Sequence, residues 1–201
     1  MDIRSKRAQT KENNRRVILD AARGVFGRDG YRTATVRDII NATPLASGTF
    51  YNYFRSKEEV YAALRDEVAH EVRPVLRAER QRARTADDFI AGTFRTFLSQ
   101  AQQRAQSLAA IDLRDDQMLA GMRMIVMGGD DLRRDIEAAA ERGLFAKPDA
   151  ELLAAAIVGI AFEVADVMRQ RQHMDVNSAA RFCTELVLRG VASLPMVEAD
   201  R

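Results

Sequence analysis

The feature of the sequence that most constrains the fold is the short break Thr43-Pro44-Leu45, which lies between two segments with helical periodicity. Pro44 has no amide hydrogen, so a helix before it cannot continue through this position. The segments on either side, about residues 36–42 and 46–53, are each about two turns long. Two short helices joined by a turn of about three residues have the spacing of a helix-turn-helix unit.

Capping residues predict where the neighbouring helices begin. Thr35 with Asp38 three residues later has the pattern of a capping box, and Ser56 with a glutamate three residues later repeats it. A helix over about residues 14–28 is expected before them. Gly30 is expected at its end, because glycine readily adopts the left-handed conformation found there.

The rest of the chain is also predicted to be helical, because no stretch shows sustained strand alternation with turn signals. Pro74 is expected to kink the helix that begins after Ser56 without ending it, since the apolar face continues across the proline. The fold class is therefore all-α, a three-helix N-terminal unit followed by a helical bundle, with about nine to ten helices. The later helices are expected to begin after Thr85, to form two short helices in residues 107–127, and to cover about 132–143, 149–170 and a stretch from Asp175 or Asn177 to Pro195.

Charge divides the chain unevenly. Residues 1–57 hold 12 Lys and Arg against 5 Asp and Glu, a net charge of +7, whereas residues 58–201 hold 19 against 24, a net charge of −5. A basic head on an acidic body indicates that the head meets a polyanion; an uneven scatter of solvated charges is the alternative. Residues 1–11 are expected to be a flexible basic arm. The predicted domains are 1–56 and 57–201.

Other features set the expected compartment. Cys183 is the only cysteine, so no internal disulfide can form, which suits a reducing environment. The first 16 residues are polar and basic, unlike a signal peptide. The longest uncharged apolar run, 152–162, falls short of the roughly 20 residues that span a bilayer. The protein is expected to be soluble, cytosolic and without a membrane partner.

The second of the two short helices has a composition suited to a nucleic-acid surface. Phe50 and Phe54 are four residues apart and share one face, so they can anchor the helix. The remaining residues are polar or small, and hydroxyls are good phosphate donors. The alternative is a tyrosine-rich helix packed on the second domain. The residues left for the exposed surface are Ser47, Gly48, Thr49, Tyr51, Asn52 and Tyr53.

The ordered run from residue 35 to residue 59, with Ala21-Ala22 and the Phe26-to-Gly30 spacing before it, resembles the DNA-binding signature of the TetR family of bacterial regulators. The resemblance covers about residues 14–62. It implies an N-terminal DNA-binding domain, followed by a domain that binds a small effector and forms dimers. Two positions depart from the family pattern. Pro44 stands where the family commonly has glycine, and Ala46 where it commonly has a capping serine, which leaves the exact start of the second short helix open.

The resemblance also implies roles for single residues. Arg37 and Asn52 align with positions that can read a base. The start of the second short helix, Ser47-Gly48-Thr49, aligns with the segment that faces the groove. The positions aligned with phosphate or backbone contacts are Thr35, Tyr51, Tyr53 and Lys57.

In the second domain, the resemblance implies that the last two long helices pair with their copies in a partner. Small residues on one helix and an apolar stripe on the other suit such an interface, and plain intramolecular core is the alternative. The candidate interface residues are Ala156, Gly159, Ile160, Cys183, Leu186, Val187, Gly190 and Val191, with Leu194 continuing the stripe.

An effector pocket is expected among aromatic and methionine side chains, which adapt to varied ligands. Most of these side chains could instead simply fill the core. Glu163 lies on the same face as the small residues of its helix, which predicts contact with a ligand or an interface partner; a partly exposed salt bridge is the alternative. The candidate ligand-binding residues are Phe94, Phe97, Met118, Met122, Phe162 and Glu163, with Met124 and Met168 as further candidates.

Together these features predict a sequence-specific transcriptional regulator, a repressor by the family's common mode. It would bind double-stranded DNA at a palindromic operator as a homodimer, with an unknown small-molecule effector shifting the population to a form that releases DNA. No cofactor, metal or enzymatic activity is expected, because His70 and His173 lack partners at metal-ligand spacing. The rival hypotheses are an enzyme, an effector-independent DNA-binding protein and a helical protein-interaction module.

Overall fold

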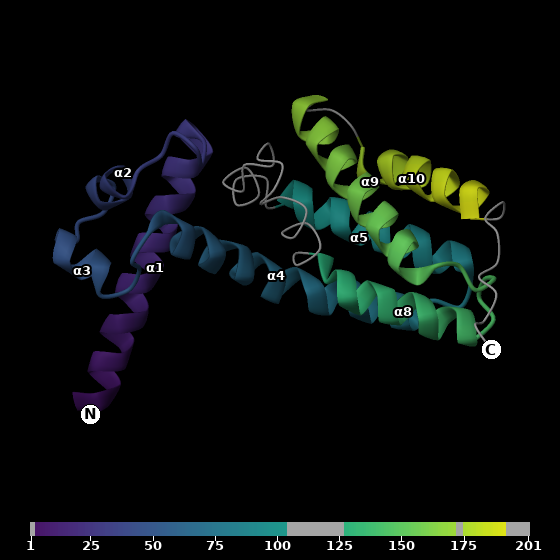
Figure 1. Cartoon of the computed structure of the whole chain (residues 1–201), viewed down its shortest axis with the longest axis horizontal. Coiled ribbons are helices and arrows are strands. Elements are labelled where there is room, and N and C mark those ends of the chain that lie inside the picture. The colour runs from purple at the N-terminus through teal and green to yellow at the C-terminus, as the bar shows by residue number, and fades with distance from the viewer. Residues whose placement is uncertain (1–2, 104–126, 172–174, 192–201) are drawn as a thin grey trace. The chain divides into compact units, whose positions relative to one another are not determined.

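The computed structural model describes residues 3–103, 127–171 and 175–191, with only the backbone described for 3–6 and 191. These ranges contain eight helices and no strand, which confirms the all-α prediction (Figure 1). The predicted total of nine to ten included two helices in residues 107–127, nearly all outside the described ranges. The helices are α1 (Ile3–Asp29), α2 (Val36–Asn41), α3 (Ser47–Tyr51), α4 (Lys57–Arg82), α5 (Ala86–Gln103), α8 (Gly129–Glu141), α9 (Ala150–Arg171) and α10 (Val176–Val191).

The described chain forms two compact units, and α4 contributes to both. Residues up to Glu67 belong to the first unit, and those from Val68 onward belong to the second. Pro74 lies inside α4, so the helix continues through it as predicted. The functional boundary expected at residues 56/57 remains a prediction.

The helix α1 is longer than the sequence pattern predicted. It begins at Ile3 rather than near Asn14, so the flexible arm expected over residues 1–11 is helical from Ile3 onward. Arginine, lysine and glutamine are good helix formers, which explains the helix. Periodicity could not detect this part, because it has no apolar face to repeat.

The core of the first unit is an aromatic cluster between α1 and α4. The rings of Tyr31 and Tyr61 lie 4.5 Å apart, and Phe26 meets Tyr31 edge-on at 5.3 Å. Gly30 has a φ of 77°, the left-handed conformation predicted for the residue that ends α1. This turn brings Tyr31 back onto Phe26 and sets the direction in which the chain approaches α2.

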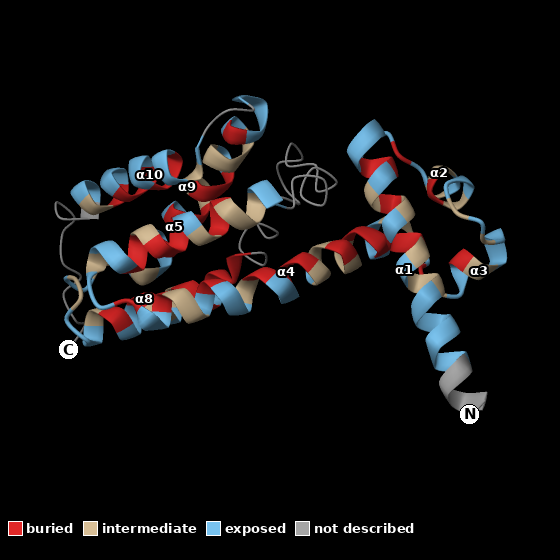
Figure 2. Cartoon of the chain, turned by 180° about the vertical axis from the view of Figure 1, so that it is seen from behind, coloured by how far each residue is buried: buried red, intermediate tan, exposed pale blue. Residues whose placement is uncertain are grey.

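The second unit is built around α5, which contacts both α9 and α10. Figure 2 shows the buried faces of these helices turned toward one another. Phe97 of α5 and Phe162 of α9 are both buried, and their ring centroids lie 4.9 Å apart. Thr85 and Asp88 form the predicted cap of α5, with each backbone amide bonded to the other's side chain.

Ion pairs join α4 to α8 inside the second unit. Arg73 donates to Asp131, which also accepts from Arg134 on its own helix. Arg80 is only 1% exposed, and its Nε donates to Asp135 Oδ2 at 2.8 Å. Burial lowers the pKa of Arg80, and the hydrogen bond that Arg80 donates to Asp135 opposes this effect.

Replacing Asp135 by Asn is expected to lower the free energy of unfolding by about 3 kcal/mol, because it leaves the Arg80 guanidinium buried without a counter-ion. Urea unfolding measures the change. In the double variant Arg80→Met/Asp135→Leu most of the loss should be recovered, since no buried charge remains. Glu137→Gln breaks the exposed pair with Arg133 and is the control, with a cost below about 1 kcal/mol. Equal costs for Asp135→Asn and Glu137→Gln would contradict the interpretation.

A search of the described residues finds no helix that is both long enough and apolar enough to cross a bilayer.

Candidate nucleic-acid interface

The short helix α3 is held by two phenylalanines. Phe50 is 2% exposed and Phe54 5% exposed, and their ring centroids lie 6.1 Å apart. Tyr51, the next residue after Phe50, is 58% exposed. The anchoring predicted from the four-residue spacing is therefore present, and it turns the other face of α3 outward.

Most of the predicted DNA-binding residues of α2 and α3 are exposed in the structure. Six of the predicted residues lie in α3 or just after it, and four of these are exposed whereas two are half-buried. Thr49 and Tyr53 are half-buried, and an added Cβ at Gly48 would meet no atom of the chain within 4 Å. The exposed predicted residues are Thr35, Arg37, Ser47, Gly48, Tyr51 and Asn52.

Thr35 forms the predicted capping box at the start of α2. Its hydroxyl accepts from the Asp38 amide at 3.2 Å and donates to Asp38 Oδ2 at 2.6 Å, and its own amide donates to the same carboxylate at 2.9 Å. These hydrogen bonds from Thr35 lower the pKa of Asp38. Both donors of Thr35 are therefore engaged within the chain, and the residue fixes where α2 begins.

The start of α3, which the sequence left open, lies at Ser47. Ala46 is the N-cap residue, with φ −68° and ψ 148°, and no side chain caps the helix. Thr43 does not replace the missing cap. Its hydroxyl donates to the Ile40 carbonyl at 2.9 Å and accepts from the Leu45 amide at 3.2 Å, so it shapes the turn between α2 and α3.

Lys57 reaches back from the start of α4 to the turn before α2. Its Nζ donates to the backbone carbonyls of Tyr31 at 3.0 Å, Arg32 at 3.2 Å and Ala34 at 3.0 Å. It also lies 4.7 Å from the centre of the Tyr31 ring. An ammonium group has three protons, and each has an acceptor here. No sequence motif indicated these contacts, because they join residues 23 or more positions apart.

A second long-range contact braces α1 on α4. Glu67 accepts from Arg15 at 3.2 Å and from Arg23 at 2.5 Å, and all three side chains are partly buried. The Arg15 guanidinium also lies 5.7 Å from the centre of the Phe54 ring. Glu67 thus fixes two arginines of α1, and one of them, Arg15, lies beside Phe54.

The predicted dimer residues fall into two groups. Ala156, Leu186 and Gly190 are exposed, and Gly159 and Ile160 are half-buried. The other group is buried in the chain's own second unit, with Cys183 0% and Val187 6% exposed. Burial raises the pKa of the Cys183 thiol to about 11. The side chains of Val191 and Leu194 lie outside those described.

Large apolar residues gather on the outward faces of α9 and α10. Of the six large hydrophobic residues exposed in the described ranges, four are on these two helices, so the exposure is concentrated there. Phe182 and Leu186 also line a shallow hollow of about 460 Å³ on α10, with Glu185 and Arg189 at its edge. The four residues are Leu152 and Val167 on α9, and Phe182 and Leu186 on α10.

Of the predicted effector-binding residues, the structure brings Phe97 and Phe162 into contact, while Phe94 is fully buried on α5. Glu163 is exposed on the outer face of α9. Met168, a further candidate, is buried. Met118, Met122 and Met124 lie outside the described residues.

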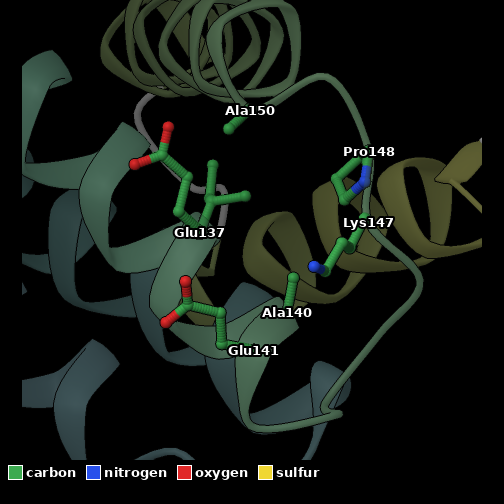
Figure 3. Close-up of a pocket in the computed structure, with 7 residues that line it drawn as sticks. Glu137, Ala140, Glu141, Lys147, Pro148 and Ala150 are labelled. Carbon is green, nitrogen blue, oxygen red and sulfur yellow. The ribbon is translucent and has the colours of Figure 1, made fainter. Parts of the chain in front are cut away.

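Figure 3 shows a cavity elsewhere in the second unit, at the C-terminal end of α8 and the start of α9. Its volume of about 160 Å³ is below the 300–1,000 Å³ typical of pockets for drug-sized ligands. None of the predicted effector-binding residues lines it. The lining residues are Ile136, Glu137, Ala140, Glu141, Lys147, Pro148 and Ala150. Among the described side chains, no group of three or more His, Cys, Asp or Glu is placed to hold a metal ion.

Comparison with known proteins agrees with this geometry. Residues 18–64 match the model of the family described as bacterial regulatory proteins, tetR family. A curated relative is the HTH-type transcriptional repressor AcnR of Corynebacterium efficiens, which is 40% identical over 57 residues. The match covers 28% of this chain and 30% of the repressor, so the chain spans less than a third of the length of this relative.

Solved structures match over most of the chain. A tetR-family regulatory protein from Rhodococcus RHA1 has a TM-score of 0.71 and 26% identity, and the match covers 89% of this chain and 96% of that one. RolR in complex with the ligand resorcinol has a TM-score of 0.64 and 20% identity, with 95% and 98% covered. The fold and the exposed α3 define an all-helical protein with an N-terminal helix-turn-helix unit and a helical C-terminal domain. Residues 18–64 therefore match the tetR family of bacterial regulatory proteins, and the fold over most of the chain is similar to that of a tetR-family regulatory protein.

Replacing Lys57 by Met is expected to lower the free energy of unfolding by about 2 kcal/mol, because hydrogen bonds from a charged donor are lost. Lys57→Arg should not recover it, since a planar guanidinium cannot converge on three carbonyls as an ammonium does. Urea unfolding of the full chain measures both variants. Arg55→Met, which removes the same charge at an exposed position nearby, should change stability by less than about 0.5 kcal/mol. Unchanged stability of Lys57→Met, together with a loss of affinity for duplex DNA, would show a direct phosphate contact instead.

Proposed function

We propose that this chain is a sequence-specific DNA-binding transcriptional repressor, which binds an approximately palindromic operator as a homodimer and is released by a small-molecule effector. The observation that carries the proposal is the outward face of α3, with Phe50 and Phe54 buried beneath it and Tyr51 58% exposed. Exposed tyrosine, serine and asparagine side chains on a helix-turn-helix match the groups that contact DNA.

The exposed residues are assigned to two kinds of DNA contact, to the bases and to the phosphate backbone. Arg37 and Asn52 can reach base edges, since arginine pairs with guanine and asparagine with adenine. Ser47, Gly48 and Thr49 face the groove at the start of α3. Tyr51 and Tyr53 contact the phosphate backbone. Gly48 allows DNA to approach the backbone of α3 closely. Packing within the chain does not require glycine at this position, because an added Cβ would meet no neighbouring atom within 4 Å.

Lys57 and Thr35 contribute indirectly in this proposal. Their donors already have acceptors within the chain, so a phosphate would have to compete with three carbonyls or with the Asp38 carboxylate. They hold the turn before α2 and the first turn of α2. This fixes the geometry of the surface that meets DNA.

A homodimer is supported by the apolar outer faces of α9 and α10. Leu152, Ala156 and Gly159 recur on one face of α9, and Phe182 and Leu186 on one face of α10. Exposed clusters of this kind mark protein interfaces. Glu163 lies on the same face of α9, so it is assigned to the partner-facing surface. Two copies related by a two-fold axis would match a palindromic operator.

The effector is proposed to bind among the aromatic side chains of the second unit, near Phe94, Phe97 and Phe162. Met118 and Met122 remain candidates for the same pocket. A protein of this fold, RolR, is known in complex with resorcinol. An effector that binds better to a form unable to engage DNA would shift the population toward release, and α4 is the candidate lever because it contributes to both units.

Selection of binding sites from random duplex DNA tests the function. The proposal expects an inverted repeat with half-sites about one helical turn apart. With the selected site in hand, Arg37→Ala is expected to cost about 1–3 kcal/mol of binding free energy and to relax the preference at one position of each half-site. Tyr51→Phe, which removes one hydroxyl, should weaken binding similarly to all sequences. Selection that returns no enriched sequence would overturn the proposal.

Replacing Leu186 by Glu is expected to convert the dimer into monomers, because it places a charge in the centre of the apolar face of α10. Sedimentation velocity should show at least about a 100-fold rise in the dimer dissociation constant. Asn177→Glu, an exposed position in the first turn of the same helix, is the control and should leave the dimer intact. A Leu186→Glu protein that remains dimeric would place the interface elsewhere.

A further inference from the structure

The N-terminal half of α1 carries positive charge that the proposed helix-turn-helix contacts do not use. Residues 3–16 contain six Lys and Arg but only one acidic residue, Glu12. Every residue from Arg7 to Asn13 is exposed, including Lys11. In Figures 1 and 2 this end of α1 extends away from α2 and α3. The segment therefore contributes nothing to the buried core of its unit.

The geometry of Arg15 shows which way the basic side chains face. Its guanidinium lies 5.7 Å from the centre of the Phe54 ring, and Phe54 packs beside Phe50, the anchor of α3. Lys11 and Arg7 precede Arg15 by four and eight residues, so they are offset from it by about 40° and about 80° around the helix axis and lie on the same side of the helix. They continue that face by about 6 Å and about 12 Å along the axis. The exposed charges thus extend the side of α1 that meets the end of α3.

Positive charge at this end of a helix opposes the helix macrodipole. The first turn of α1 contains no acidic residue, and the basic residue Arg7 follows it directly, close to the positive end of the dipole. The arrangement costs the helix some stability in isolation. A polyanion bound along this face would remove that cost.

The composition of the segment selects among possible partners. A membrane-surface helix needs an apolar face, and a helix that docks in a protein groove needs apolar anchors at helical spacing. Between Arg7 and Asn13 the only apolar residue is Ala8. Duplex DNA needs neither, because it presents one negative charge per roughly 1.7 Å of its axis.

We infer that residues 7–11 of α1 form a second DNA-contacting surface, in which Arg7 and Lys11 bind backbone phosphates beside the half-site that α3 occupies. The inference rests on the proposed DNA-binding function and adds to it a sequence-independent contact. Its signature is electrostatic, since each phosphate contact that is lost reduces the slope of log affinity against log salt by about 0.9.

The test compares the full-length protein with Arg7→Gln/Lys11→Gln, using fluorescence anisotropy of a labelled 40-base-pair duplex of mixed sequence between 50 and 200 mM NaCl. The slope is expected to fall by about 2 for each bound arm. Over this range the original protein should then lose roughly tenfold more affinity than the variant for each arm that is bound, and roughly 100-fold more if both arms of a dimer are bound. Arg82→Gln/Arg84→Gln removes the same charge from exposed positions of the second unit and should keep the original slope. The charge-conserving variant Arg7→Lys/Lys11→Arg should also keep it.

The outcomes separate this inference from the function on which it rests. A protein that ignores the duplex even at 50 mM NaCl defeats the proposed function itself. Duplex binding with the same slope in the original protein and in Arg7→Gln/Lys11→Gln overturns only the second surface. Loss of binding to phosphatidylserine vesicles in that variant, with duplex binding unchanged, would assign the basic face to a membrane instead and would also overturn the inference.

Discussion

The burial of Phe50 and Phe54 is the interaction on which the candidate site depends. The helix α3 has only five residues, and isolated helices of that length do not form in water. It exists because the first unit encloses these two rings. Since the apolar side chains of α3 are used for anchoring, its remaining side chains must face outward, and those are the polar residues that DNA can bind. Burial of Phe50 and Phe54 therefore accounts both for the formation of α3 and for the exposure of its polar face.

The charged residues around this surface have two different tasks. Lys57 and Glu67 are paired within the chain. Lys57 donates to three backbone carbonyls, and Glu67 forms ion pairs with two arginines of α1. They hold α1, the turn before α2 and the start of α4 in one arrangement. Arg37 is exposed and lies outside these internal networks. Rigid positioning by the first group reduces the entropy that the second group would lose on binding.

Local chemistry could be predicted from the sequence, and long-range pairing could not. The capping pair Thr35 and Asp38, the left-handed Gly30 and the turn at Pro44 follow from rules that act over a few residues, and the structure shows all of them. The contacts of Lys57 and Glu67 join distant parts of the chain, so no spacing rule reveals them. The early start of α1 was missed because a helix without an apolar face has no period to detect.

The same limit applies to the candidate interface in the second unit. The pattern of α10 showed an apolar stripe but not which part of it meets the chain's own α5. The structure buries Cys183 and Val187 and leaves Leu186 exposed, so a single stripe divides into core and surface. Only packing within the unit decides this division. The aromatic residues of α5 could be predicted as a set. Which of them enclose an effector depends on the shape of the packed unit, and composition alone does not determine that shape.

The most direct test of the account is the environment of Tyr51 with and without duplex DNA. All four tyrosines lie in the first unit, so 3-fluorotyrosine labelling gives four ¹⁹F resonances, which Tyr→Phe variants assign. Saturation with a selected operator should shift the Tyr51 resonance and reduce its solvent isotope effect, while the buried Tyr31 and Tyr61 change little. A Tyr51 resonance that stays unchanged and solvent-exposed when the protein is saturated with DNA would contradict the claim that α3 is the recognition surface.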